Sequence, residues 1–567
     1  MAGYIGSKAS VTQVDGYTKT EAESRYANVT GDVFSGDVTF SGNVLADGGT
    51  IKLDGNYPTG TGNVALGNTA LDNLTSGNYN TAIGSDAMDA NTSASENTSV
   101  GYASLFANTE GANNVAVGST ALYDNTTGSN NVAVGKSSLA NNITASNNVA
   151  VGAGAIGLDT KGDKTTAVGK DALGVQNFTS ATDTYNTALG YYAGAAVTTG
   201  TLNTLIGGLA GDAITTGERN VIAGHSAGGA LTVGGSNTAI GDRALLADTK
   251  GSNSVAVGRN ALFSQNFTSA TNAYNIAIGR DAGASISTGE KNTLVGAQAG
   301  DALTDTDANV AIGFNALGSD TLGTKSVAIG ESALFTQNFT SSTISYNTAI
   351  GVDAGVSVTN GDKNTLIGTS AGDSITSGGN NTVVGALADI SSSTGNSEIV
   401  LGKSCLGQGS YYFTFGKDNG SNRVYNQYSS NATFTRVSDE RYKEDIQTNT
   451  DCGLDFINDL RTVTFKFKAL SDIPDTLPDY DAEATTRYYP DKLYGVIAQE
   501  VKAALDTHNI TDFGGHHIDP KTGIQGIAQS MFIYPLIKAV QELSAKNDAL
   551  ETEIATIKTR LDTLEAG

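Results

Sequence analysis

The sequence predicts a mainly β protein, with an elongated β-solenoid or β-roll shaft of repeats followed by a smaller α+β domain. Three observations lead to this fold class. A short phrase recurs with a fixed period across residues 63–402, the composition changes after Gly402, and apolar residues near the C-terminus follow a heptad pattern. Fixed short periods are typical of solenoids, in which each repeat forms one turn of a stack.

Each repeat ends on a glycine that follows a short apolar phrase, as in Asn114-Val115-Ala116-Val117-Gly118. Twenty such glycines lie between Gly67 and Gly402, separated by sixteen steps of 17 residues and three of 21. The alternation before the glycine predicts a strand of three or four residues, and the glycine permits a bend. An Ala-Leu step further on, such as Ala121-Leu122, predicts a second short strand in the same turn.

The three 21-residue steps share the phrase Gln-Asn-Phe-Thr-Ser. Because a stacked core cannot absorb four extra residues, we predict loops that project from the shaft over residues 176–185, 265–274 and 337–346. These loops are candidate receptor contacts. Their proposed contact residues are Asn177, Phe178, Asn266, Phe267, Asn338 and Phe339.

The phrase Asn-x-Val/Thr-Ala-Ile/Val-Gly resembles the head repeats of trimeric autotransporter adhesins over residues 63–402. The resemblance implies left-handed β-rolls with three chains side by side. The period of 17 residues is longer than the usual period of those heads.

Composition and charge narrow the function classes. The chain has 567 residues, with 70 Gly, no Trp and 16% charged residues, a Gly-rich but periodic composition that indicates repeats rather than disorder. A formal charge of −24 argues against a nucleic-acid partner, because phosphate binding needs basic clusters. No apolar run approaches the roughly 20 residues that span a bilayer. We therefore expect neither nucleic-acid binding nor membrane insertion.

Cofactor and metal motifs are not evident in the sequence. Cys405 and Cys452 form no metal, redox or disulfide pattern, so we expect buried free thiols. The adjacent His516 and His517 favour a polar loop over a metal site across a trimer axis. The N-terminus lacks the basic region and apolar core of a signal peptide, and we expect synthesis in a cytoplasm.

The segment before the repeats divides at about residue 30. In residues 1–30, Thr18 and Glu21 have capping-box spacing and predict a short helix. The surrounding phrase, Tyr17 to Ala27, resembles segments near the attachment end of bacteriophage tail fibres, which implies a virion-attachment segment. A plain surface helix is the alternative. In residues 31–62, brief apolar alternation broken by glycines predicts a β stalk.

The repeat rhythm ends at Gly402, and residues 403–437 contain aromatic, strand-like segments. We predict a neck or cap on the last turn, because a solenoid end exposes strand edges and core. Next come Val437-Ser438-Asp439-Glu440-Arg441-Tyr442-Lys443. A serine becomes a nucleophile when a base removes its proton, and a lysine serves as that base where burial favours its neutral form. Taken alone, this spacing is more often an ordinary loop.

Residues 438–567 resemble the C-terminal intramolecular chaperone domain of phage endosialidases and tail spikes, classed as the self-cleaving peptidase S74 family. A Ser-Asp-x-Arg-x-Lys motif, a Gly-x-Ile-Ala-Gln-Glu-Val motif and a closing apolar helix carry the resemblance. It implies a catalytic Ser-Lys dyad that cuts at its own first residue. The matching residues are Ser438 and Lys443 as the dyad, Val437 and Ser438 as the cleavage site, and Asp439, Arg441, Gly495, Gln499 and Glu500 as support.

The C-terminal segment, residues 535–565, predicts a coiled coil. Apolar residues from Leu536 to Leu564 alternate steps of four and three, with Asn547 at one seam position. The seam predicts self-association without distinguishing two strands from three; the resemblance implies a homotrimer.

Together these features predict a trimeric bacteriophage tail fibre or tail spike, located in the virion, that binds a host surface receptor, expected to be a glycan. Its N-terminal end would bind a tail or baseplate protein, and it needs no cofactor. The only catalysis suggested is one self-cleavage by a serine peptidase. Two alternatives stay open: a spike whose shaft degrades a polysaccharide, and a cellular surface adhesin.

Overall fold

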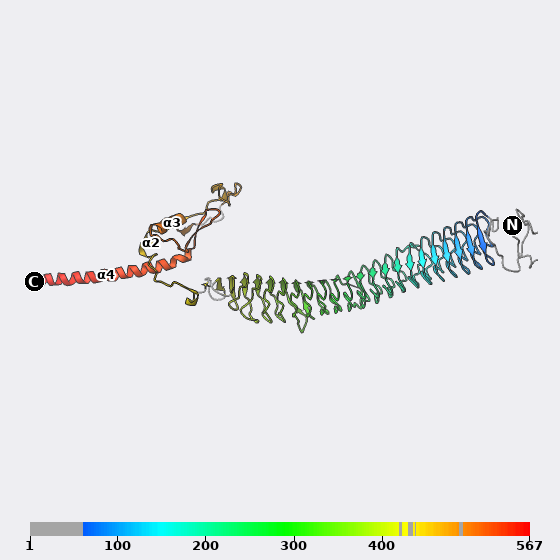
Figure 1. The fold of residues 1–567 in the computed structure, drawn as a ribbon, viewed down its shortest axis with the longest axis horizontal. Helices are drawn as coiled ribbons and strands as arrows, with labels where there is room; N and C mark the ends of the chain where they lie inside the picture. The colour runs from blue at the N-terminus through cyan, green and yellow to red at the C-terminus, as the bar shows by residue number, and fades with distance from the viewer. Residues whose placement is uncertain (1–59, 419–421, 429–434, 437, 487–491) are drawn as a thin grey trace, which may run out of the picture. The chain divides into compact units, whose positions relative to one another are not determined.

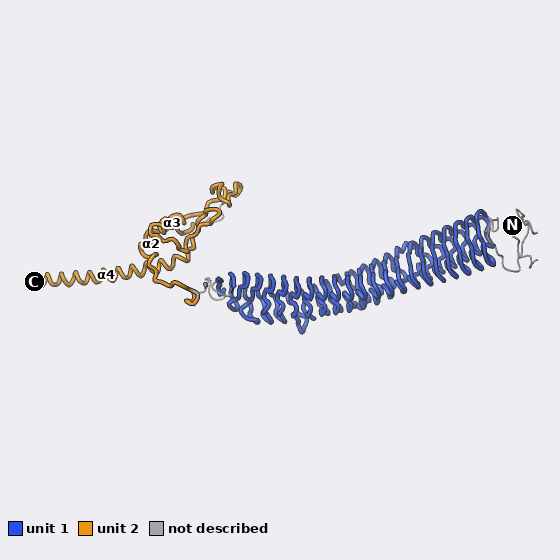
Figure 2. Tube along the Cα trace, in the orientation of Figure 1, with its two compact units in different colours: residues 1–437 blue, residues 438–567 orange. Residues whose placement is uncertain are grey.

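The computed structural model describes residues 60–418, 422–428, 435–436, 438–486 and 492–567. The expected attachment segment and nearly all of the expected stalk lie outside these ranges. The chain divides into two compact units, residues 1–437 and 438–567, which are coloured separately in Figure 2. Each unit is described by itself.

The first unit is a β-solenoid in which one three-residue strand precedes each repeat glycine, as predicted. Figure 1 shows these strands stacked along the shaft. Consecutive strands pair parallel and in register, so that Ala116 lies opposite Ala133. The twenty strands are β1 Val64–Leu66, β2 Thr81–Ile83, β3 Thr98–Val100, β4 Val115–Val117, β5 Val132–Val134, β6 Val149–Val151, β8 Thr166–Val168, β10 Thr187–Leu189, β11 Thr204–Ile206, β12 Val221–Ala223, β13 Thr238–Ile240, β15 Val255–Val257, β17 Ile276–Ile278, β18 Thr293–Val295, β19 Val310–Ile312, β21 Val327–Ile329, β23 Thr348–Ile350, β24 Thr365–Ile367, β25 Thr382–Val384 and β26 Ile399–Leu401.

The predicted second strand of each turn is wrong. Ala121 and Leu122 are fully buried, as an apolar step should be, but they lie in a turn. The backbone of Leu122 is left-handed, with φ +52°, which is incompatible with an extended strand. The Ala-Leu step therefore bends the chain inward and fills the core.

The middle residue of each strand also points into this core. Ala116, Ala133 and Ala150 are 0% exposed, whereas the residues on either side of them are half-buried. Successive side chains of a strand point to opposite faces, so the outward face of the sheet is lined by Val, Ile, Leu and Thr. The core is thus narrow and built from small side chains.

Each 21-residue turn contains an additional two-residue strand, which pairs parallel with a two-residue strand of the preceding 17-residue turn. Two of the extra residues pair with the preceding turn instead of leaving the shaft. These pairs are β7 Gly162–Asp163 with β9 Thr182–Asp183, β14 Gly251–Ser252 with β16 Thr271–Asn272, and β20 Gly323–Thr324 with β22 Thr343–Ile344.

After the last repeat glycine, β27 (Tyr412–Gly416) pairs parallel with β26. The strands β28 (Arg423–Gln427) and β29 (Thr435–Arg436) then add in antiparallel order. Glu398, fully buried, occupies the ladder position that asparagine holds in most turns, and it accepts hydrogen bonds from Ser391 and Gly409. The aromatic segment thus continues the sheet beyond the last turn.

The second unit is α+β and packs around Phe456, Val501 and Leu505. Within the described ranges, no helix is both long enough and apolar enough to cross a bilayer. His516 and His517 lie in a strand and not in the expected loop. The elements are η1 Glu440–Tyr442, α2 Leu454–Asn458, β30 Val463–Phe465, η2 Leu470–Asp472, β31 Leu493–Gly495, α3 Ala498–Thr507, β32 His516–Ile518, β33 Gln525–Ile527, η3 Gln529–Phe532 and α4 Ile533–Glu565; β30 pairs with β31 and β32 with β33, both antiparallel.

Candidate functional site

Ser438 and Lys443 flank the single turn of η1. Asp439 caps this turn, its Oδ1 accepting the backbone N–H of Arg441 at 2.9 Å, and the Lys443 N–H donates to the Glu440 carbonyl at 2.9 Å. The turn brings together side chains five positions apart. Lys443 Nζ donates a hydrogen bond to Ser438 Oγ at 2.8 Å. A nucleophile and its base need this kind of contact.

Asp439 and Arg441 form a two-pronged ion pair beside the dyad. Arg441 Nε donates to Asp439 Oδ1 at 2.9 Å, and its terminal nitrogen donates to Oδ2 at 2.7 Å. The guanidinium and the Arg441 backbone N–H hold the pKa of Asp439 below its ordinary value. The carboxylate thus stays ionised and shapes the turn, while Lys443 reaches the serine hydroxyl.

The second family-like motif lies at the corner between β31 and α3. Gly495 ends β31 opposite Val463, and Glu500 lies in the first turn of α3, where Gln499 precedes it. Arg461 donates to Glu500 Oε2 at 3.1 Å and lowers the pKa of that carboxyl. No hydrogen bond found among the described residues joins this motif to Ser438 or Lys443.

Glu542 makes a contact within this unit that the sequence does not predict. Its Oε2 accepts the backbone N–H of Leu454 at 2.7 Å, which ties the start of α2 to α4. Lys538 lies one turn earlier on α4, 3.3 Å from the same carboxylate. No sequence signal distinguishes Glu542 from the other glutamates of α4, because its partner is a backbone group 88 positions away.

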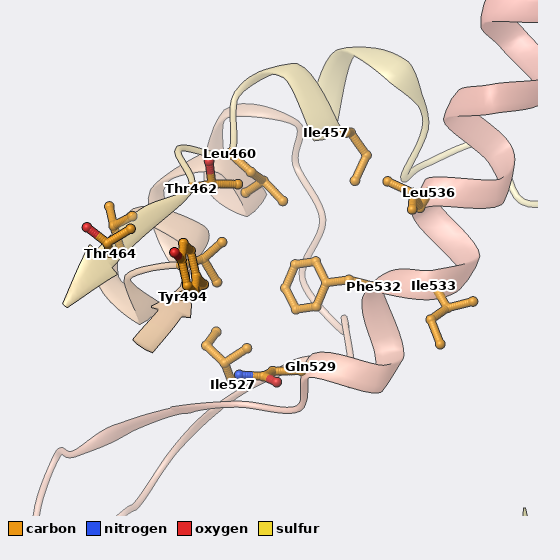
Figure 3. A pocket seen from close by; sticks show the side chains of 13 residues that line it. Ile457, Leu460, Thr462, Thr464, Tyr494, Ile527, Gln529, Phe532, Ile533 and Leu536 are labelled. Carbon is orange, nitrogen blue, oxygen red and sulfur yellow. The ribbon is translucent and has the colours of Figure 1, made fainter. Parts of the chain in front are cut away.

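An apolar groove of about 800 Å³ opens beside α4 in this unit (Figure 3). Figure 3 shows Phe532 at its centre, with Ile457 and Leu536 on one side and Tyr494 on the other. Leu536 is also the first residue of the heptad seam and is 54% exposed. The groove is lined by Ile457, Leu460, Thr462, Val463, Thr464, Tyr494, Gly495, Val496, Ile527, Gln529, Phe532, Ile533 and Leu536.

The predicted receptor contacts in the loops of the 21-residue turns are partly wrong. The phenylalanines proposed as receptor contacts, Phe178, Phe267 and Phe339, are only 5–6% exposed. The ring of Phe178 packs against Gly162, where a Cβ would meet it at 2.9 Å. This packing removes the ring from the surface. The neighbouring Asn177, Asn266 and Asn338 are exposed, as expected.

A buried polar network lies beneath each loop. In the third, Gln337 Nε2 donates to Ser326 Oγ at 2.9 Å and to Asp320, while its Oε1 accepts from Asn347 at 2.8 Å. Burial raises the pKa of Asp320. The first and second loops repeat the arrangement. The sequence carried a signal for it, since an aspartate stands 17 residues before each loop glutamine: Asp159 and Gln176, Asp248 and Gln265, Asp320 and Gln337.

The described part of the chain bears on the sequence predictions for metal ligands and cysteines. No three His, Cys, Asp or Glu side chains there are grouped to hold a metal ion. Cys405 and Cys452 are buried free thiols, as expected.

Comparison with known proteins adds one match. Residues 438–510 match the peptidase S74 family model, described as the chaperone of endosialidase. No curated protein and no solved structure matches the chain. The matched segment begins at Ser438, which is the first residue of the second compact unit. The chain therefore carries an endosialidase-type chaperone domain after a β-solenoid shaft, a combination that fits a tail fibre or tail spike.

Proposed function

We propose that this protein is a homotrimeric bacteriophage tail fibre or tail spike that attaches the virion to a host surface glycan. Its N-terminal end binds a tail or baseplate protein. Its C-terminal unit is an intramolecular chaperone that assembles three chains and then removes itself between Val437 and Ser438. The observation that carries the proposal is the Ser438–Lys443 contact at the first residue of the chaperone-like unit.

The cleavage follows from this contact. Ser438 Oγ attacks the carbonyl carbon of residue 437, and Lys443 Nζ accepts the hydroxyl proton and passes it to the departing amide nitrogen. Water then hydrolyses the resulting ester, which releases a carboxylate on residue 437 and restores the serine hydroxyl. Val437 itself lies outside the described residues.

The exposure of Lys443 supports cleavage after assembly. A lysine acts as a base in its neutral form, which burial favours. In the single chain, both Ser438 and Lys443 are exposed. A neighbouring chain that covers the turn would supply the missing burial, so that chains are cut only once they have assembled.

The heptad seam of α4 supports self-association. This 33-residue helix carries apolar side chains every three or four residues, and Leu550, Ile554, Ile557 and Leu561 are each 53–56% exposed. Helices with such a seam bury it against one another in a coiled coil.

The outward face of the shaft supports self-association independently. Leu189, Ile206, Ile240, Ile278 and Ile350, each the last residue of its strand, are 38–48% exposed. They belong to one continuous parallel sheet, whose strands are spaced by about 4.8 Å. Apolar stripes of this length are rarely left exposed to water. A second copy of the same shaft has the same spacing and can cover the stripe along its whole length.

The test is expression of the full chain. We expect a fragment that ends at Val437 and a second that begins at Ser438, identified by intact mass. Ser438→Ala and Lys443→Ala should each reduce cleavage by about a thousandfold or more, because each removes a group needed for the same covalent step. Asp439→Asn should reduce cleavage less than either dyad substitution, because it weakens the turn but leaves both dyad side chains in place.

The assembled state serves as the control. Uncut Ser438→Ala chains should also sediment as a trimer, since Ser438 lies outside the seam, and this trimer should be heavier than the cut fibre because each chain keeps residues 438–567. A wild-type chain that trimerises and stays whole would remove self-cleavage from the proposal and leave the chaperone role.

A further inference from the structure

We propose that the third 21-residue turn carries a binding site for an uncharged glycan. The proposal rests on the proposed function, in which the shaft attaches to a host surface, and it assigns the contact residues. A cavity of about 520 Å³ lies between this loop and the turn that follows it along the shaft. Its polar lining includes Asn338, Thr340, Ser341, Thr343, Asn360 and Asp362.

The lining has the chemistry of a sugar site. The hydroxyl groups of Thr340 and Ser341 are exposed and, among the described residues, make no hydrogen bond to the protein. On the following turn the carboxylate of Asp362 is an acceptor for sugar hydroxyls, and charge-assisted hydrogen bonds of this kind are the strong ones. The hydroxyls, an amide and a carboxylate together offer the mixed donors and acceptors that a ring of sugar hydroxyls requires.

The cavity is held open by the shaft, so binding requires little ordering of the loop. Asn338 donates its backbone N–H to the Thr359 carbonyl at 2.8 Å, and Thr343 Oγ1 donates to the Ser341 carbonyl at 2.9 Å. Phe339, which also lines the cavity, is buried, and its backbone N–H donates to Asp320 Oδ1 at 3.4 Å. A preformed polar cavity binds a ligand at a lower entropic cost than a mobile loop does.

The charge of the lining selects a neutral ligand. The cavity contains the carboxylate of Asp362 and no cationic side chain. The nearest chain neighbour, Lys363, forms an ion pair with that same carboxylate. The whole chain carries a formal charge of −24. Because Lys363 is already paired with Asp362, a sialic or uronic acid would find no free cation in this lining, whereas a hexose or N-acetylhexosamine needs none.

The first loop offers a matched control. It has the same hydroxyl pair in Thr179 and Ser180. The turn that follows it has Thr201 where the third has Asp362, so it lacks the carboxylate. The two loops otherwise share the buried network and the short strand pair.

The experiment compares two triple variants of the full chain. One is Thr340→Ala/Ser341→Ala/Asp362→Ala, and the other is Thr179→Ala/Ser180→Ala/Thr201→Ala. The probe is a set of immobilised neutral oligosaccharides of hexose and N-acetylhexosamine, with matched oligosaccharides that end in sialic or uronic acid. We expect the third-loop variant to lose about tenfold or more in affinity for the neutral glycan that wild type binds, because several hydrogen bonds disappear together. The first-loop variant should bind as wild type does.

The remaining outcomes separate the two proposals. If the third-loop variant keeps its neutral-glycan affinity, or if acidic glycans bind wild type more tightly, the site assignment fails while attachment to host cells stands. If the wild-type fibre binds neither glycans nor host envelopes, attachment itself fails, and the glycan site fails with it.

Discussion

At the residue scale, a buried asparagine ladder connects the turns of the shaft. Asn203 is 0% exposed; its Oδ1 accepts the backbone N–H of Asn220 at 3.1 Å, and its Nδ2 donates to the Gly217 carbonyl at 2.9 Å. Buried polar groups are tolerated when they are hydrogen-bonded in this way. The ladder thus satisfies corner backbone groups that have no strand partner.

Two adjacent glycines provide the sharpest test at this scale. Gly207 has φ +130°, and a Cβ there would lie 2.6 Å from the Gly224 carbonyl oxygen of the next turn. We expect Gly207→Ala to destabilise the local structure by about 2–4 kcal/mol, through backbone strain and the clash. Hydrogen exchange of the amides around residues 204–224 measures this, because long repeat arrays need not unfold in two states.

Gly208→Ala is the matched control. A Cβ at Gly208 would find its nearest neighbour, the His225 ring, at 3.9 Å. The substitution should change local exchange by no more than about 0.5 kcal/mol. Equal effects at the two positions would refute the stacking argument for the repeat glycine.

At the element scale, the short helix α2 depends on a contact with α4. A five-residue helix is too short to be stable alone, and its N-cap residue, Gly453, has no side chain to satisfy the first N–H groups. Glu542 supplies the missing acceptor for Leu454. The contact thus joins the first and last helices of the C-terminal unit.

This contact predicts a pH dependence. The Leu454 N–H and the Lys538 ammonium hold the pKa of Glu542 below its ordinary value of 4.5, so the folded state favours the ionised carboxyl. The stabilisation is therefore complete above about pH 4.5 and is lost as the pH falls through the lower folded-state pKa. Glu542→Gln should reduce the thermal stability of the helical signal near neutral pH and flatten its change with acid. Circular dichroism at 222 nm measures this signal.

Glu551→Gln is the reference variant for that measurement, because Glu551 is exposed on the same helix and accepts its hydrogen bond from Asn547 of α4. An unchanged acid profile in Glu542→Gln would show that the contact contributes nothing to stability.

At the scale of the whole molecule, two apolar surfaces are exposed to water in the single chain. One is the stripe on the outward face of the shaft, and the other is the heptad seam of α4. Parallel stacking over a long shaft offers many wrong registers between chains, since every turn resembles its neighbours. In the proposed assembly, a coiled coil of α4 helices would remove most of them before the shafts pack. Loss of the coiled coil should therefore affect assembly more than the fold of a single turn.

Deletion of residues 438–567 tests this order of events. We expect most of the truncated shaft to be insoluble or to form mixed aggregates, because its outward apolar stripe remains uncovered. Uncut Ser438→Ala chains should remain soluble. Solubility after centrifugation, followed by sedimentation velocity, distinguishes the two. A truncated shaft that sediments as a soluble, uniform trimer would mean that the shaft sets the register between its chains without the C-terminal unit.

The repeat strands and their glycines were predictable from the sequence because they depend on local geometry. A strand of three residues needs only alternation, and the bend at Gly207 needs only an absent side chain. The Ser438–Lys443 dyad was expected only from the family resemblance, because the spacing alone is more often an ordinary loop. In the structure one helical turn brings the two side chains to 2.8 Å.

Only the tertiary structure decided which residues of the loops are buried and which remain available. Phe339 is buried because its backbone N–H and its ring meet groups of the previous turn, Asp320 and Gly323. The polar cavity joins Thr340 to Asp362, which belongs to the following turn. Such contacts depend on how consecutive turns stack, and the sequence of a single turn does not contain that information.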